Sequence, residues 1–233
     1  MSRYAAAARG AARALLPLDR ARERALREAR TLTQLSGGLI RGLHRGTWDP
    51  DAAARLEASA QALRRLAQRH PYLMHHGAVV SAFCEYAEAH LLRHHLAGRD
   101  PPSYRALRVP PAAYLLGLGD AVGELRRAAL DALLQGRTAE AERAVDAMEK
   151  VYEALQESQA PEPLVGLRPK IDAARSLLER TRGDLVNGKR AKELERKIDD
   201  VARLLDEAEA RGKPRPKAKK DDELDLDSAW SKS

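Results

Sequence analysis

The sequence predicts an all-α protein built as an antiparallel bundle of six or seven helices. Apolar residues recur every three or four positions over most of the 233-residue chain, which is the period of an amphipathic helix. No stretch shows the alternation of apolar and polar residues that is typical of a β-strand. Aromatic residues make up only 4% of the sequence, so we expect a core of Leu, Ala and Val packed between helices.

Capping residues and prolines set the predicted helices in the first half of the chain. The first helix covers residues 18–44, with Ala and Leu on one face and Arg and Glu on the other. Asp49-Pro50 suits the start of a second helix over 50–69, because Asp is a good N-cap and Pro a good first-turn residue. A third helix spans roughly residues 72–96.

Four more helices are predicted in the second half, over residues 110–134, 138–156, 170–185 and 190–209. Pro110-Pro111 opens the first of them and Gly136 ends it. Asn187-Gly188 is expected to interrupt the helical pattern and to separate the last two helices.

The pattern divides the chain into three parts. Residues 1–188 form the predicted helical domain, residues 189–211 an additional C-terminal helix, and residues 212–233 a charged tail. The tail places a basic block before an acidic one and lacks apolar periodicity, so we predict that it is disordered. A short partner-binding peptide around Trp230 is the alternative interpretation.

Charge and cysteine content limit the partners and the compartment. A net charge of +7 and an isoelectric point near 9.7 favour polyanions, either nucleic acid or an acidic membrane surface. No run of about 18 uncharged apolar residues occurs, so no membrane-spanning segment is expected. The single cysteine, Cys84, cannot form an internal disulfide, which is consistent with a cytoplasmic protein.

Two predicted helices each carry a pair of carboxylates on one face. Glu85 and Glu88 are three residues apart, and Asp120 and Glu124 are four residues apart. With 34 acidic residues in the chain, most such spacings are only solvated charges. Asp120 is different, because it is the one charged residue between positions 112 and 122 and should be at least partly buried.

A buried carboxylate requires a compensating partner. Leaving it unpaired costs several kcal/mol, so a hydrogen-bond donor, a cation or a metal ion should lie nearby. Carboxylates alone would favour Mg²⁺ or Mn²⁺ over zinc, and such a site could activate water against a phosphodiester. Gly117, Gly119 and Gly123 indicate either a close helix contact or a distorted backbone at the site.

Four stretches carry a resemblance to a known family. They are LREARTLTQLSGGLIRGLHRG (26–46), AFCEYAEA (82–89), LRVPPAAYLLGLGDAVGELRR (107–127) and RPKIDAARSLLERTRGDL (168–185). Together they resemble the translin superfamily, in particular the translin-associated factor X (Trax) branch and its archaeal relatives. The resemblance covers most of residues 18–187, and residues 190–233 extend beyond it.

The resemblance implies a seven-helix bundle that assembles into a closed homo- or hetero-oligomer, often an octamer, and binds single-stranded nucleic acid. In this family only the Trax-type subunit carries a Mg²⁺-dependent RNase centre, made of a Glu-x-x-Glu pair and an Asp. Those positions match Glu85, Glu88 and Asp120, with Glu124 as an additional ligand or a water-orienting group. Glu124 next to Arg126 and Arg127 is equally open to a structural ion-pair role.

Basic residues along the first predicted helix form a candidate nucleic-acid surface. The residues are Arg20, Arg24, Arg27, Arg41 and Arg45. Such a stripe suits phosphate backbones, and the scarcity of aromatics predicts contacts that tolerate any base sequence. Pairing of individual arginines with Glu23 and Glu28 is the alternative.

The sequence gives less support to a zinc site. Residues 90–94 read HLLRH, which lacks the Glu of a zinc-binding HExxH motif. The main hypothesis is therefore a metal-dependent endoribonuclease acting on single-stranded RNA. The alternatives are a non-catalytic oligomer that binds single-stranded DNA or RNA, and a scaffold that recruits partners through its tail.

Overall fold

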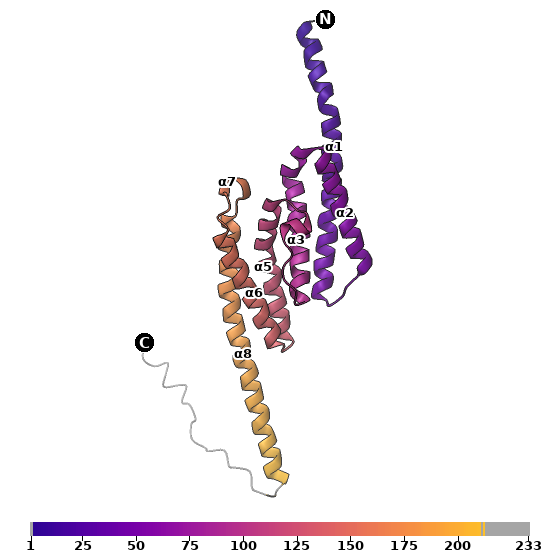
Figure 1. The fold of residues 1–233 in the computed structure, drawn as a ribbon. Helices are drawn as coiled ribbons and strands as arrows, with labels where there is room; N and C mark the ends of the chain where they lie inside the picture. The colour runs from indigo at the N-terminus through magenta and orange to yellow at the C-terminus, as the bar shows by residue number, and fades with distance from the viewer. Residues whose placement is uncertain (1, 211, 213–233) are drawn as a thin grey trace, which may run out of the picture. The chain divides into compact units, whose positions relative to one another are not determined.

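The computed structural model describes residues 2–210 and residue 212, and their regular structure is entirely helical (Figure 1). The long helices of this part are α1 (Arg3–His44), α2 (Pro50–Arg69), α3 (Gly77–Leu96), α5 (Pro111–Leu134), α6 (Thr138–Glu157) and α8 (Arg168–Ala210). Two short helices, α4 (Tyr104–Leu107) and α7 (Glu162–Val165), and a 3₁₀ turn, η1 (Pro71–His75), lie between them. The predicted all-α helical bundle is confirmed.

Several helices begin where the capping residues indicated. The Asp49 carboxylate accepts hydrogen bonds from the backbone N–H groups of Asp51 at 2.9 Å and Ala52 at 3.0 Å, which fixes the start of α2. The third predicted helix is divided, because η1 precedes α3 and the His76 imidazole caps α3 by accepting from Ala78 N–H at 3.3 Å.

Two predicted boundaries were wrong. Helix α1 begins at Arg3, not at 18, and contains Pro17 in its interior. The Ala-rich sequence on the N-terminal side of Pro17 has high helix propensity, which offsets the hydrogen bond that proline removes. Helix α8 also continues through Asn187-Gly188, because neither residue removes a backbone donor and each costs only about 1 kcal/mol or less relative to Ala.

The structure divides into two compact units, of which the first runs to Gly188. One core of this unit joins α1, α2 and α3, with Leu32, Leu63 and Phe83 fully buried. A second core joins α5, α6 and the first half of α8 around Val122, Met148 and Leu178. Helices α3 and α5, which carry the predicted carboxylates, contact each other between these cores.

The second unit begins at Lys189 and contains the second half of α8. In the part of this unit that the structure describes, large apolar side chains are exposed, including Leu194, Ile198 and Val201. Residue 211 and residues 213–233 lie outside the described part, and with them nearly all of the predicted tail. Among the described residues, no helix is long and apolar enough to cross a membrane.

Candidate functional site

The four predicted carboxylates lie on the two helices that contact each other in the middle of the first unit. Glu85 and Glu88 belong to α3, and Asp120 and Glu124 belong to α5. Gly117 allows the helices to approach closely, since a Cβ there would lie 2.9 Å from the Cys84 carbonyl oxygen and 3.0 Å from the Ala87 Cβ. Close packing thus accounts for Gly117 and also for Gly119, where a Cβ would lie 2.8 Å from the Lys170 Cβ.

Glu88 is the most deeply buried of the four, with 8% of its surface exposed. Its burial, followed by the negative charges of Glu85, Asp120 and Glu124, raises its pKa to about 8. The pKa of Glu85 is also raised, first by burial and then by Asp120 and Glu124. The four carboxylates therefore lie close enough to act on one another, although they are separated along the sequence.

Asp120 has two partners that come from other helices. The Lys170 ammonium of α8 forms an ion pair with Asp120 Oδ1, and the Cys84 thiol of α3 donates to Asp120 Oδ2 at 3.3 Å. The Asp120 side chain is 32% exposed, as its apolar neighbourhood predicted. Burial opposes the charge of Lys170, but the hydrogen bond and charge of Asp120 outweigh it, and the pKa of Lys170 is raised.

Glu124 contacts a buried histidine that the sequence did not single out. Nε2 of His44, near the end of α1, lies 2.5 Å from Glu124 Oε2, and its Nδ1 lies 3.6 Å from Asp131 Oδ2. The hydrogen bond to His44 lowers the pKa of Glu124. Arg126 pairs with Asp184 at 3.0 Å, whereas the charge of Arg127 also lowers the pKa of Glu124, so the alternative of a structural ion-pair role for Glu124 stays open.

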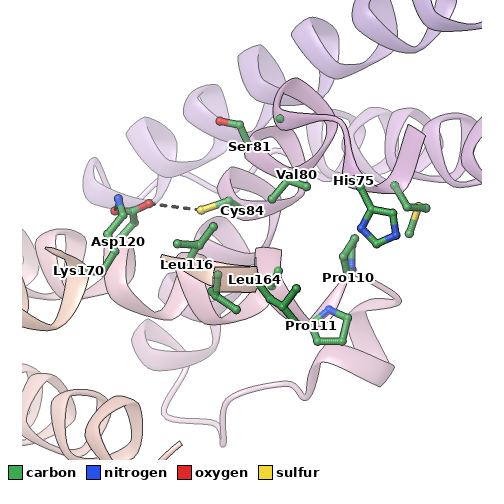
Figure 2. A pocket seen from close by; sticks show the side chains of 14 residues that line it. His75, Val80, Ser81, Cys84, Pro110, Pro111, Leu116, Asp120, Leu164 and Lys170 are labelled. Carbon is green, nitrogen blue, oxygen red and sulfur yellow. Dashed lines mark hydrogen bonds and ion pairs between the residues drawn. The ribbon is translucent and has the colours of Figure 1, made fainter. Parts of the chain in front are cut away.

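A pocket of about 660 Å³ opens beside Asp120 between α3, α5 and the α7 segment (Figure 2). Asp120 and Lys170 lie at one end of it, and His75 and Pro111 lie at the other. Val80, Leu116 and Leu164 line the part between. The pocket provides a solvent-accessible route to the charged end.

The side chains as they stand do not form a metal-coordination sphere. Within residues 2–210 and 212, no group of three or more His, Cys, Asp or Glu side chains is placed to hold a metal ion. Lys170 supplies the positive charge at Asp120 instead. Burial and the charge of Asp120 raise the pKa of the Cys84 thiol, so this cysteine stays in its protonated form.

The five arginines predicted to bind nucleic acid are all exposed on α1 or directly after it. They are Arg20, Arg24, Arg27, Arg41 and Arg45, and within the described residues none of them forms an ion pair. Glu23 pairs with Arg22 at 2.7 Å rather than with any of the five. The stripe lies on the side of α1 opposite the buried Ala25, Ala29 and Leu32.

Helix α2 extends this basic stripe. A groove of about 240 Å³ between α1 and α2 is lined by Arg24 and Arg27 together with Arg65 and Arg69. Glu28 is the one acidic residue that lines it. Arg65 and Arg69 were not among the predicted binding residues, because nothing in the local sequence indicates that they face α1.

The two histidines of the HLLRH sequence, His90 and His94, contact other groups of the protein. His90 Nε2 lies 3.0 Å from Glu57 Oε1, and His94 Nδ1 lies 2.8 Å from the Asp100 carbonyl oxygen. Together with the capping role of His76, these contacts give the imidazoles structural roles in the bundle.

Fold and site together define a helical-bundle protein with a cluster of carboxylates between two helices and an arginine-lined groove. The translin family model matches residues 20–182. An uncharacterized protein of Methanocaldococcus jannaschii is 31% identical over 169 residues, which is 72% of this chain and 76% of that protein. The chain therefore belongs to the translin family.

Solved structures agree with this assignment. A structure of AfC3PO in complex with duplex RNA is 33% identical with a TM-score of 0.66, and the match covers 78% of this chain and 96% of that one. A crystal structure of AfC3PO is 35% identical with the same TM-score, covering 78% and 97%. Apo-NeC3PO, at 21% identity, a TM-score of 0.63 and coverage of 81% and 98%, shows a similar fold.

Proposed function

We propose that this chain is a metal-dependent endoribonuclease that hydrolyses single-stranded RNA at the α3–α5 carboxylates. The observation that carries the proposal is the convergence of four carboxylates from two helices, with Glu88 buried among the other three. A carboxylate buried near three others must either take up a proton or be compensated by a cation. Under this proposal the chain belongs to the catalytic, Trax-like branch of the family, because it retains the complete set of acids.

A divalent cation suits the chemistry of this donor set. Glu85, Glu88 and Asp120 would hold Mg²⁺ or Mn²⁺ through oxygen atoms, which are the ligands that these hard cations prefer. When bound, the cation supplies charge neutralisation at the phosphodiester and lowers the pKa of a coordinated water. His44 contacts Glu124, and under this proposal the Glu124 carboxylate orients the attacking water.

The basic residues supply the second part of the proposal, which is substrate retention. The arginine stripe of α1 and the groove shared with Arg65 and Arg69 present guanidinium groups that match phosphate geometry. The likeness to AfC3PO, whose solved complex contains duplex RNA, supports RNA as the ligand class. Assembly into a closed homo-oligomer, such as an octamer, is part of the same proposal.

A cleavage assay with labelled RNA tests the catalytic claim. The whole chain with Mn²⁺ should cut single-stranded RNA, and Asp120→Asn should reduce the rate by about 100-fold or more, because the amide holds the cation that neutralises the reacting phosphate less tightly. Asp172→Asn, a change at an exposed acid on α8, is the matched control and should leave the rate unchanged. Equal cutting by wild type and Asp120→Asn would exclude this site, and a parallel duplex substrate shows which form is preferred.

A second candidate is a non-catalytic translin-like oligomer that binds single-stranded DNA or RNA. The ion pair between Lys170 and Asp120 favours it, because the lysine compensates the aspartate without a metal. Under this alternative, RNA binds in a salt-sensitive way but survives incubation with Mn²⁺. The same assay therefore separates the two functions.

A further inference from the structure

The second half of α8 carries an exposed row of apolar residues. Ala191, Leu194, Ile198, Val201, Leu205 and Ala208 follow one another at alternating steps of three and four residues. Leu194, Ile198 and Val201 are 59%, 58% and 55% exposed. A strict alternation of three and four is the heptad repeat of a coiled coil, in which the row forms a single seam along the helix.

Outside this row the helix surface is mostly charged, with the exposed Leu204 at a g position beside the seam, and two ion pairs run along the helix. Lys197 bonds to Glu193 at 2.8 Å and Arg203 to Asp200 at 3.1 Å, both along the helix. Helices in proteins gain most of their stability by burying an amphipathic face. The seam formed by 191–208 is the face of this segment that remains to be covered.

We propose that residues 190–209 pair in parallel with the same segment of a second copy of this chain, as a two-stranded coiled coil. The seam is complementary to itself, since each layer places one apolar residue opposite its own copy. Ile198 at an a position and Leu194 at a d position form the combination that favours two strands, and Leu205 at a with Val201 at d is the reverse combination, so the choice of two strands rests on the first pair. The inference goes beyond the proposed function, because the translin match ends at residue 182.

Charge complementarity selects the parallel orientation. In a parallel pair, a g residue faces the e residue of the following heptad on the other chain, so Arg190 faces Glu195 twice by symmetry. In the antiparallel pair that aligns the whole seam, Lys197 would face Leu204 and Glu195 would face Ala202. Only the parallel arrangement therefore gains ion pairs between the chains.

Single cysteine substitutions in the full-length protein test the seam. Under mild oxidation, Leu194→Cys and Val201→Cys should form disulfide-linked dimers, because a parallel pair holds each of these positions next to its own copy. Arg196→Cys and Arg203→Cys, on the opposite side of the helix, are matched controls and should react at least about tenfold more slowly. The buried Cys84 leaves the wild type as a low background.

Two outcomes would overturn the proposal. One is that the seam cysteines react no faster than the Arg196→Cys and Arg203→Cys controls. The other is that the double variant Leu194→Cys/Leu205→Cys forms dimers while neither single variant does, which is the signature of antiparallel pairing. Both are independent of RNA cleavage, so the seam and the nuclease proposal can fail separately.

A charge exchange tests the orientation in the Val201→Cys background. Arg190→Glu and Glu195→Arg each place like charges opposite each other at two symmetric positions and should lower the dimer yield by about fivefold. Combining the two substitutions restores opposite charges and should restore the yield. Equal dimer yields for the two charge variants and their combination would contradict the parallel pairing.

Discussion

The pKa of Glu88 depends on the helices that surround its side chain. Its carboxylate is buried on α3, and α5 brings Asp120 and Glu124 to the same place. Its pKa is about 8, against an ordinary value of 4.5, so the folded, metal-free protein binds a proton that the unfolded chain has released at neutral pH. The stabilisation from this proton is complete below pH 4.5 and is lost as the pH rises through 8.

We therefore expect Glu88→Gln to change the pH dependence of stability. The amide cannot ionise, so in the presence of a chelator the Tm of the variant should rise relative to wild type between about pH 5 and pH 9. Thermal unfolding followed by circular dichroism across this range measures the difference. Glu153→Gln, on the exposed face of α6, is the matched control. Parallel Tm curves for Glu88→Gln and wild type would show that Glu88 is not in the environment described.

At the scale of elements, the contact between α3 and α5 depends on small residues. Gly117 lies directly against the α3 backbone, whereas a Cβ at Gly123 would meet no atom within 4 Å. Both glycines belong to the same helix, and both interrupt a segment of otherwise good helix formers. Substitutions at the two positions therefore distinguish the effect of helix packing on stability from the effect of helix propensity.

Alanine substitutions at these two glycines should act in opposite directions. Gly117→Ala should lower the free energy of unfolding by about 1–3 kcal/mol, because its methyl group overlaps the Cys84 carbonyl oxygen. Gly123→Ala should raise it by about 0.5–1 kcal/mol, because it gains helix propensity without a clash. Urea denaturation measures both. A change of the same sign at both positions would argue against close α3–α5 packing at Gly117.

At the scale of the helical unit, positive and negative groups occupy different surfaces. The carboxylates cluster between α3 and α5, and the exposed arginines cluster on α1 and α2. A polyanion is attracted to the second surface and repelled from the first unless cations are present. The proposed binding surface and the proposed catalytic carboxylates thus lie on different helices.

RNA binding should weaken with salt in proportion to the number of arginines that neutralise a phosphate. Arg65→Ala and the double variant Arg24→Ala/Arg65→Ala should reduce the slope of log affinity against log salt by about 0.7 for each phosphate that is no longer neutralised. Fluorescence anisotropy of a labelled single strand over a KCl series measures this slope. Arg175→Ala, on α8, is the control. An unchanged slope in the double variant would remove the α1–α2 groove from the binding surface.

Local patterns were sufficient for the fold but not for the partners within the site. The start of α2 was predictable because Asp49-Pro50 acts within one turn of the helix. The position of Pro17 inside α1 was not predictable, because the helix propensity of the residues before it outweighs the effect of a single proline. Lys170 lies 50 residues from Asp120 and His44 lies 80 residues from Glu124, so only packing brings these groups together.

The native thiol of Cys84 lies at the contact between α3 and α5, so its reaction with an added reagent can report on this site. Its thiol is 7% exposed and hydrogen-bonded to Asp120, and the thiolate is the form that reacts with alkylating agents. Burial and the contact with Asp120 raise the pKa of the thiol, so alkylation through the pocket that Cys84 lines should be slow at neutral pH. The rate of thiol modification therefore reports on access to Asp120, and any ligand that fills the pocket should slow it further.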